Sequence, residues 1–243
     1  RIAPIFQCYY HAFSDESCSK NSKIINIFKG WDVVGDHFMI WDYQCNFVEY
    51  FWYYPTNHYL KENLQTYAEM GVVNIMNQSS YTQDKIWFDQ LRSYVSSKLY
   101  WNLDWDMEYL INEFIELYYD SAAPAVKEVY RLFDDYYASL RMDGKLTVSI
   151  LSDTSPFLGG EIHEVNWLNR IISTIDNAMA NVKEEALTTG ISAEELRERL
   201  ELIKLTPMRM ILRNYTSYYG EETKKSYAIE FFDLCDKYGI VFL

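Results

Sequence analysis

Two carboxylates stand in a stretch crowded with aromatic rings, residues 37–55 (HFMIWDYQCNFVEYFWYYP). Asp42 lies between Trp41 and Tyr43, and Glu49 follows in what reads as a long loop. Glycosidases use two carboxyl groups, one protonated and one ionised, at a separation that sets the stereochemical outcome. We therefore take Asp42 as the candidate catalytic residue. The alternative is that Asp42 caps a loop, and that Glu49, like most glutamates in loops, is simply solvated.

Aromatic and polar side chains near the first of these carboxylates could hold a sugar. Tryptophan and tyrosine rings are flat and partly apolar, so Trp41, Tyr43 and Trp52 are candidates for stacking on a sugar ring. His11 and Gln78 follow two other apolar runs, and their side chains can hydrogen-bond to hydroxyl groups. Equally, Trp52 and its neighbours could pack against a second, helical domain and never meet a ligand.

Three short apolar runs are the elements that must position these residues. Residues 2–10, 38–43 and 72–76 lack a clean alternation of polar and apolar residues, which predicts strands buried on both faces. A helical stretch follows each run, and this order predicts parallel strands joined by right-handed crossovers. Because parallel strands bring their carboxyl ends to one rim, we expect Asp42 and the other strand ends to meet there.

The second part of the chain is helical throughout. Apolar residues recur at three- and four-residue steps over residues 107–118, 126–140 and 168–182, which predicts three long amphipathic helices. Pro207 reads as the start of a further helix, and Gly220 as the break before the last one.

This change of pattern predicts two domains. Residues 1–102 form an α/β part and residues 103–243 an all-helical part, with a linker over residues 144–160 inside the second. No internal repeat or low-complexity segment interrupts either part.

Charge and hydropathy exclude two classes of partner. The formal net charge is −13, whereas a nucleic-acid partner demands clustered lysine and arginine. No apolar run approaches the length needed to cross a bilayer, so we predict a globular protein without a membrane partner.

Motifs for metals and cofactors are also lacking. The cysteines show neither CxxC spacing nor a histidine partner pattern, which supports neither zinc nor redox chemistry; they are Cys8, Cys18, Cys45 and Cys235. The chain contains no GxGxxG or GxxxxGK[ST] loop, and the sequence EIHEVNW lacks the second histidine of a zinc-protease helix. We therefore predict no cofactor and no metal.

From residue 91 the chain reads LRSYVSSKLYWNLDWDMEYLINEFIELYYDSAAPAVKEVY. This block resembles the DUF4838 family, uncharacterised proteins of carbohydrate-degrading bacteria, with its pattern Lys-Leu-x-Trp-[Asn/Asp] followed by Glu-Phe-x-x-x-Tyr-Tyr-Gly-x-Ala-Ala. The stretches IWDYQCNF and GVVNIMNQSSY are similar to segments of the same family, and the motifs occur in the same order. One departure is Asp120, where the family usually has glycine.

The resemblance implies a fold and a context. The implied α/β fold is the C-terminal part of a (β/α)8 TIM-type barrel, followed by an all-α helical domain. Since a full barrel takes roughly 250 residues, the missing N-terminal part of the barrel would be a partner and would carry the main catalytic acid. Asn46, with Asp42, Tyr43 and Gln78, would then be a substrate-binding or accessory group. A secreted or periplasmic location is implied in the same way.

Three functions remain open on this evidence. The first is the C-terminal fragment of a glycoside hydrolase, which contributes sugar-binding residues at the barrel rim. The second is a non-catalytic carbohydrate-binding or scaffolding module. The third is an unrelated α/β protein whose helical domain binds a partner, and this one predicts no glycan binding at all.

Overall fold

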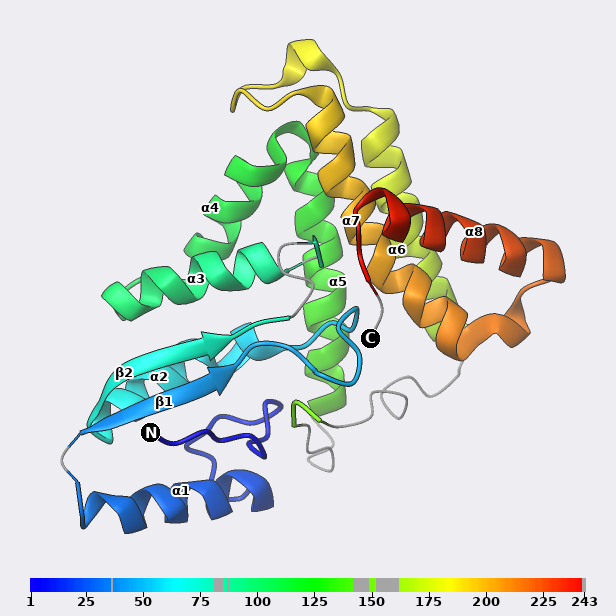
Figure 1. The fold of residues 1–243 in the computed structure, drawn as a ribbon. Coiled ribbons are helices and arrows are strands. Elements are labelled where there is room, and N and C mark those ends of the chain that lie inside the picture. Colours follow the sequence, from blue (N-terminus) through cyan, green and yellow to red (C-terminus); the bar gives the residue numbers. More distant parts are fainter. Residues whose placement is uncertain (36, 81–84, 87, 142–148, 152–161, 242–243) are drawn as a thin grey trace.

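The computed structural model describes residues 1–243 except 36, 81–84, 87, 142–148, 152–161 and 242–243. A small parallel sheet and two flanking helices occupy one end of the molecule, and the remaining helices form the rest (Figure 1). The elements of the first end are α1 (Ser19–Asp32), β1 (Phe38–Tyr43), the 3-10 turn η1 (Thr56–Tyr59), α2 (Leu60–Glu69) and β2 (Val72–Gln78).

The helical part follows in chain order. Its long helices are α3 (Asp89–Trp101), α4 (Met107–Tyr119), α5 (Ala123–Arg141), α6 (Ile162–Ala180), α7 (Ala193–Met210) and α8 (Glu221–Lys237). Short helical turns are η3 (Asp120–Ala122), η5 (Glu184–Ala186), the π-helical η6 (Ile211–Tyr215) and η7 (Thr216–Tyr218). No helix among the described residues has both the length and the apolar character that a membrane crossing requires.

The sheet has two parallel strands. Asp42 pairs with Asn77 and Tyr43 with Gln78, so the two carboxyl ends lie side by side, as predicted. The predicted strand over residues 2–10 is wrong: only Ile2 forms a bridge, to Ile40 of β1. Pro4 lacks a backbone N–H, and the amides of Ile5 and Gln7 donate to the carbonyls of Ala3 and Pro4. These groups are therefore not available to a neighbouring strand, and the segment does not continue the ladder.

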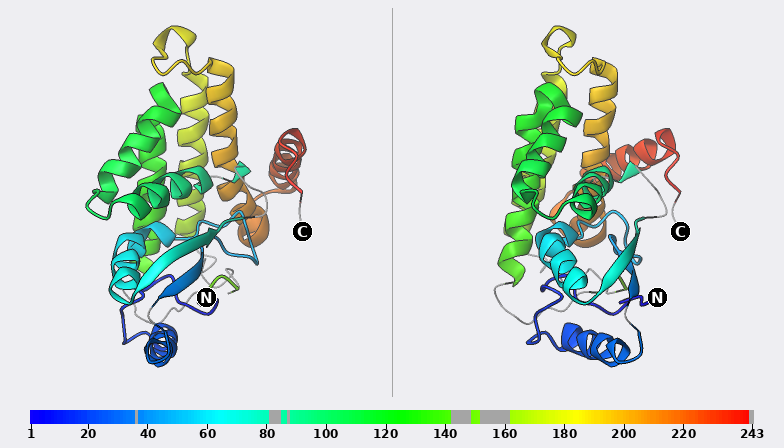
Figure 2. Two further views of the ribbon diagram at one scale, coloured as in Figure 1. Left: turned by 60° about the vertical axis from the view of Figure 1, so that its left-hand side comes forward. Right: turned by 90° about the vertical axis from the view of Figure 1, so that its left-hand side faces the viewer.

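The predicted fold class is therefore also wrong. The described chain is mostly helical with a two-stranded sheet, and it contains no recognisable portion of a (β/α)8 barrel. Helix α2 covers one face of the sheet, whereas no helix of the described chain covers the other face (Figure 2). A barrel needs a ring of paired strands, and among the described residues β2 has no further strand beside it.

The predicted helices of the second part are present. Each of the helices α3 to α8 contacts the next one along the chain. Asp106 caps α4 by accepting a 2.7 Å hydrogen bond from the Tyr109 amide, which satisfies an otherwise unpaired donor. The prediction that Pro207 starts a helix is wrong, because Pro207 lies inside α7, four residues before the π-helical turn. The predicted linker falls largely outside the described residues.

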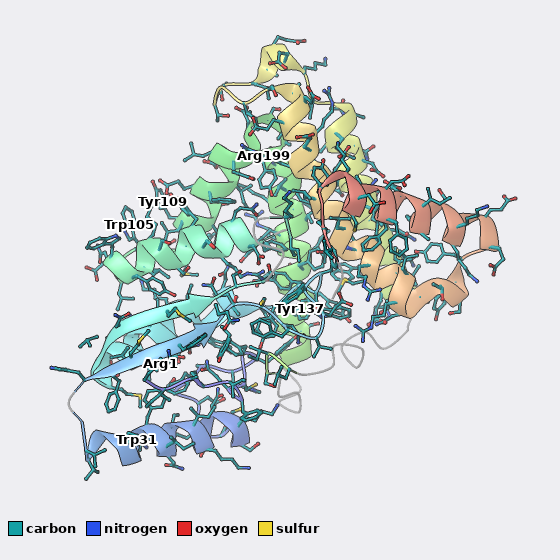
Figure 3. All side chains as sticks on the ribbon, viewed as in Figure 1. Arg1, Trp31, Trp105, Tyr109, Tyr137 and Arg199 are labelled. Carbon is teal, nitrogen blue, oxygen red and sulfur yellow. The ribbon has the colours of Figure 1, made fainter. Side chains whose placement is uncertain are left out.

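Aromatic rings join the two predicted domains. Phe133 of α5 lies 5.4 Å from Tyr53, 6.0 Å from Phe88 and 5.1 Å from Trp167, measured between ring centroids. Tyr137, one turn further along α5, lies 4.9 Å from Tyr53. We call these five residues the aromatic junction; Figure 3 shows Tyr137 where the end of the sheet meets α5. The division at residue 102 stays a prediction, and the junction spans it.

Candidate functional site

The carboxyl end of the sheet gathers three of the predicted sugar-binding residues. Trp41 is half-buried, and its indole N–H donates a 2.8 Å hydrogen bond to Oε1 of Gln78. Tyr43 lies two positions beyond Trp41 and therefore on the same face of β1, but its ring is buried. The Arg1 guanidinium lies 4.7 Å from the centre of the Trp41 ring, and Figure 3 shows Arg1 beside β1. We call Arg1, Trp41 and Gln78 the sheet-end surface.

Asp42 points the opposite way, into the core between β1 and α2. Its carboxylate accepts hydrogen bonds from the Tyr9 hydroxyl at 2.7 Å, the Tyr43 amide at 2.8 Å and the Tyr67 hydroxyl at 3.5 Å. The side chain is buried, and this desolvation raises the pKa of Asp42 although the three hydrogen bonds oppose the rise. Burial likewise raises the pKa of Tyr9 well above its ordinary value.

Replacing Asp42 with asparagine should make stability less dependent on pH. An acid whose pKa is raised by folding contributes stability that is fully present below its unfolded pKa of about 3.9 and lost as the pH rises through the folded pKa. Asparagine cannot ionise and keeps an acceptor for Tyr9 and Tyr43. Urea unfolding from about pH 4 to pH 7 measures the free energy of unfolding. The value for Asp42→Asn should increase relative to that of the wild type as the pH rises.

The exposed carboxylate Asp233 provides the control for this experiment. Asp233→Asn should leave the pH profile of the wild type unchanged. If Asp42→Asn instead loses stability relative to the wild type as the pH rises, the carboxylate is the favoured form in the folded protein and the burial argument is wrong.

The other predicted site residues do not reach the sheet-end surface. Asn46 is buried and accepts hydrogen bonds from the amides of Val48 and Glu49 at 2.8 and 3.0 Å, so it shapes a turn. Trp52 is buried in the core. His11 lies beside Cys8, whose sulfur is 3.2 Å from the imidazole Nδ1. For these three residues the structure shows internal contacts rather than a common binding surface.

Glu49 is engaged with the helical part of the molecule. Its buried carboxylate accepts from Nε and Nη2 of Arg209 at 3.0 and 2.8 Å, and from Nη1 of Arg213 at 3.0 Å. Glu49 could act as a second catalytic carboxylate beside Asp42 only if it broke its contacts with both arginines. The structure therefore gives Glu49 a role in holding the loop after β1 against α7 and η6.

A buried ion pair at the start of α3 was not anticipated from the sequence. Arg92 and Asp89 of α3 form it, and the Ser80 hydroxyl also donates to Asp89. A second guanidinium N–H of Arg92 donates to the Tyr54 carbonyl at 3.3 Å, which fixes the loop after β1. The signal was present, since opposite charges three positions apart lie on one side of a helix.

A cavity of about 310 Å³ between η1, α4 and α5 was also missed. His58 and Asp134 line it with their nearest atoms 3.9 Å apart, and the Tyr53 hydroxyl donates to Asp134 at 3.2 Å. Partial burial raises the pKa of Asp134. The cavity lies apart from the predicted site residues, none of which lines it.

Comparison with known proteins decides the family. The family model described as Domain of unknown function (DUF4838) matches residues 1–131, which is more than half of the chain. The chain belongs to the DUF4838 family. The predicted family is therefore confirmed, and the part shared with DUF4838 includes the sheet, the sheet-end surface and helices α1 to α4. No curated protein and no solved structure matches the chain.

Proposed function

We propose that the sheet-end surface binds a saccharide. The observation that supports this proposal is the half-buried Trp41 ring, held by Gln78 on the face of the sheet that α2 does not cover. A tryptophan in such a position offers a rigid apolar ring together with polar neighbours, a combination typical of binding surfaces.

The neighbouring groups suit a ligand rich in hydroxyls. The amide N–H groups of Gln78 are donors, and so are the five N–H groups of Arg1, whose guanidinium already lies over the Trp41 ring. A pyranose presents C–H groups on its faces and hydroxyls around its rim. The ring of Trp41 would contact a sugar face while Gln78 and Arg1 bond to its hydroxyls.

Binding fits this geometry better than hydrolysis by the predicted carboxylates. Asp42 faces the core side of β1, and Glu49 is paired with two arginines, so neither is presented beside Trp41. One observation favours hydrolysis as the second candidate: the raised pKa of Asp42 is a property of general acids. Release of reducing sugar by the wild type, abolished in Asp42→Asn without loss of glycan binding, would favour this candidate.

Replacing Trp41 with alanine should weaken glycan binding about tenfold or more, because a central aromatic contact commonly contributes more than 1.4 kcal/mol. The measurement is a glycan array with the purified protein, followed by calorimetric titration of the best ligand. The matched control is Trp101→Ala, since Trp101 is 92% exposed at the end of α3. Circular dichroism should show that both variants are folded.

Two outcomes would contradict the proposal. The first is an array without any bound glycan for the wild type. The second is a glycan that Trp41→Ala and Trp101→Ala bind as well as the wild type does, which would place the binding surface elsewhere.

A further inference from the structure

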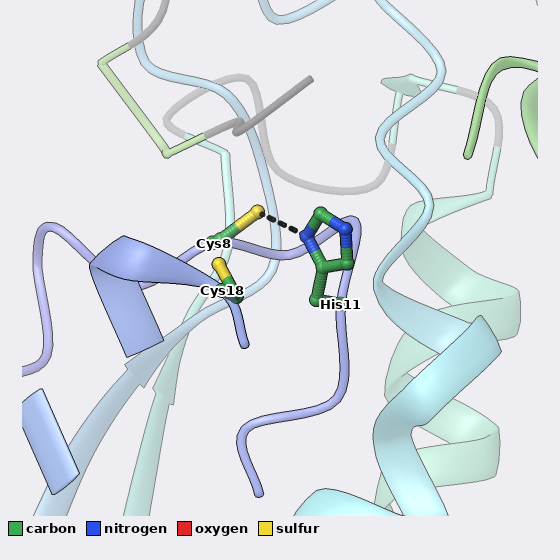
Figure 4. A group of neighbouring side chains, drawn as sticks. All are labelled: Cys8, His11 and Cys18. Atoms are coloured by element: carbon green, nitrogen blue, oxygen red, sulfur yellow. Dashed lines mark hydrogen bonds between the residues drawn. The ribbon is translucent and has the colours of Figure 1, made fainter. Parts of the chain in front are cut away.

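Cys8, His11 and Cys18 lie together beside the start of α1 (Figure 4). Their potential ligand atoms, two sulfurs and one imidazole nitrogen, all lie within 4.8 Å of one another. Both cysteines are buried and carry no disulfide, whereas His11 is half-buried. We call these three residues the thiol–imidazole cluster.

A buried asparagine holds the segment that carries two members of the cluster. The Oδ1 atom of Asn21 accepts from the Cys8 amide at 2.7 Å. The Nδ2 group of Asn21 donates to the carbonyls of Cys8, His11 and Ala12 at 3.2, 3.4 and 2.8 Å. Because Asn21 belongs to α1 and is fully buried, it fixes the backbone of Cys8 and His11 against this helix.

Cys18 enters the cluster from the N-terminus of α1. It occupies the N-cap position, and its side chain makes no capping hydrogen bond. Its amide donates to the Asp15 carbonyl at 3.2 Å, which fixes the backbone there.

We propose that Cys8, His11 and Cys18 bind one Zn²⁺ ion through two thiolates and Nδ1 of the imidazole. Zinc accepts this set of ligands, and a site with three protein ligands keeps its fourth position for water or a substrate. Each thiol loses its proton to solvent when the metal binds. His11, predicted as a sugar-binding residue, is thereby a metal ligand, and the site is independent of the proposed saccharide surface.

The spacing of the ligand atoms is compatible with this ion after a small adjustment. The Cys8 sulfur and the His11 nitrogen are 3.2 Å apart, close to the roughly 3.5 Å that Zn–S and Zn–N bonds impose at a tetrahedral ion. Two zinc-bound sulfurs lie about 3.8 Å apart, which side-chain rotation can reach from the separations present.

The test uses the whole chain, reduced and stripped of metal, with Co²⁺ as a spectroscopic probe and Zn²⁺ as the competitor. We expect a sulfur-to-cobalt charge-transfer band that saturates at one ion per chain and disappears when zinc is added. Zinc should also raise the melting temperature. A folded protein that lacks this band would overturn the proposal. So would a protein whose Cys8 and Cys18 form a disulfide and which still binds no zinc after that disulfide is reduced.

Variants locate the site. Cys18→Ser and His11→Gln should each weaken zinc binding by more than the roughly 10–100-fold that loss of an outer-shell partner costs. The matched control is Cys235→Ser, because Cys235 is a buried free cysteine outside the cluster and its loss should leave the affinity unchanged. His11→Gln alters a half-buried side chain and should remain folded, as circular dichroism will show. If Cys235→Ser lowers the zinc affinity as much as Cys18→Ser and His11→Gln do, the assignment is overturned.

Discussion

Replacing Asp89 with alanine should destabilise the protein by about 3–5 kcal/mol, the usual cost of leaving one partner of a buried ion pair alone. The side chains of Arg92 and Asp89 are 3% and 4% exposed, so water cannot replace the lost carboxylate. The Ser80 hydroxyl would lose its acceptor as well. Urea unfolding at neutral pH measures the change.

An exposed ion pair provides the matched control. Arg170 and Glu128 are 2.7 Å apart with side chains 62% and 44% exposed. Solvated pairs contribute about 0–1 kcal/mol, so Glu128→Ala should change little. Similar losses in Asp89→Ala and Glu128→Ala would show that burial does not govern the first pair. The family match includes residues 89 and 92, so this pair lies within the shared part of DUF4838.

Replacing Phe133 with alanine should cost about 3–5 kcal/mol, the range for removing a buried aromatic ring and leaving a cavity. Phe133 is fully buried and contacts rings from both predicted domains. We therefore expect the wild type to unfold in one transition, and Phe133→Ala to shift that transition as a whole. Unfolding followed by tryptophan fluorescence and by far-ultraviolet circular dichroism measures both points.

Leu117 of α4 provides the control for the core substitution, because it is 61% exposed. Leu117→Ala should change stability by about 0.5 kcal/mol or less. Two separate transitions in the wild type, only one of which moves in Phe133→Ala, would show that residues 1–102 and 103–243 unfold independently despite the aromatic junction.

Local patterns were sufficient to predict most of the elements. The run FMIWDY predicted β1 with its observed bounds, because a six-residue apolar run is long enough for a strand and too short for a typical helix. The spacing of apolar residues over 168–175 predicted the buried face of α6. Leu168, Ile171 and Ile175 on this face are fully buried in the structure. Because side chains alternate along a strand, Asp42 faces away from Trp41 and Tyr43, and its contacts with Tyr9 and Tyr67 agree with this.

Long-range partners account for the errors. The run after Arg1 is as apolar as β1, but Pro4 and local turns remove it from the ladder after Ile2. The apolar composition of a segment predicts that it is buried, but it does not predict which other segment it packs against. The barrel was implied by resemblance, and the described residues supply one parallel pair instead of a ring of strands.

The chemistry of the site depended on the same kind of information. No sequence spacing pairs Glu49 with Arg209, and none reveals that Tyr67 of α2 reaches Asp42. Cys8 and His11 are close enough in the sequence to have suggested a metal site. The third ligand, Cys18, joins them only because Asn21 folds the preceding segment back onto α1.

The hydrogen bonds from Arg209 and Arg213 to Glu49 join residues 160 and 164 positions apart. Closing so long a loop carries an entropic cost that contacts between successive helices do not incur. Neighbouring helices such as α4 and α5 can associate early, whereas the Glu49 contact stabilises only a chain whose two ends are already in place. We therefore expect this contact to form late in folding, so that its loss should mainly raise the rate of unfolding.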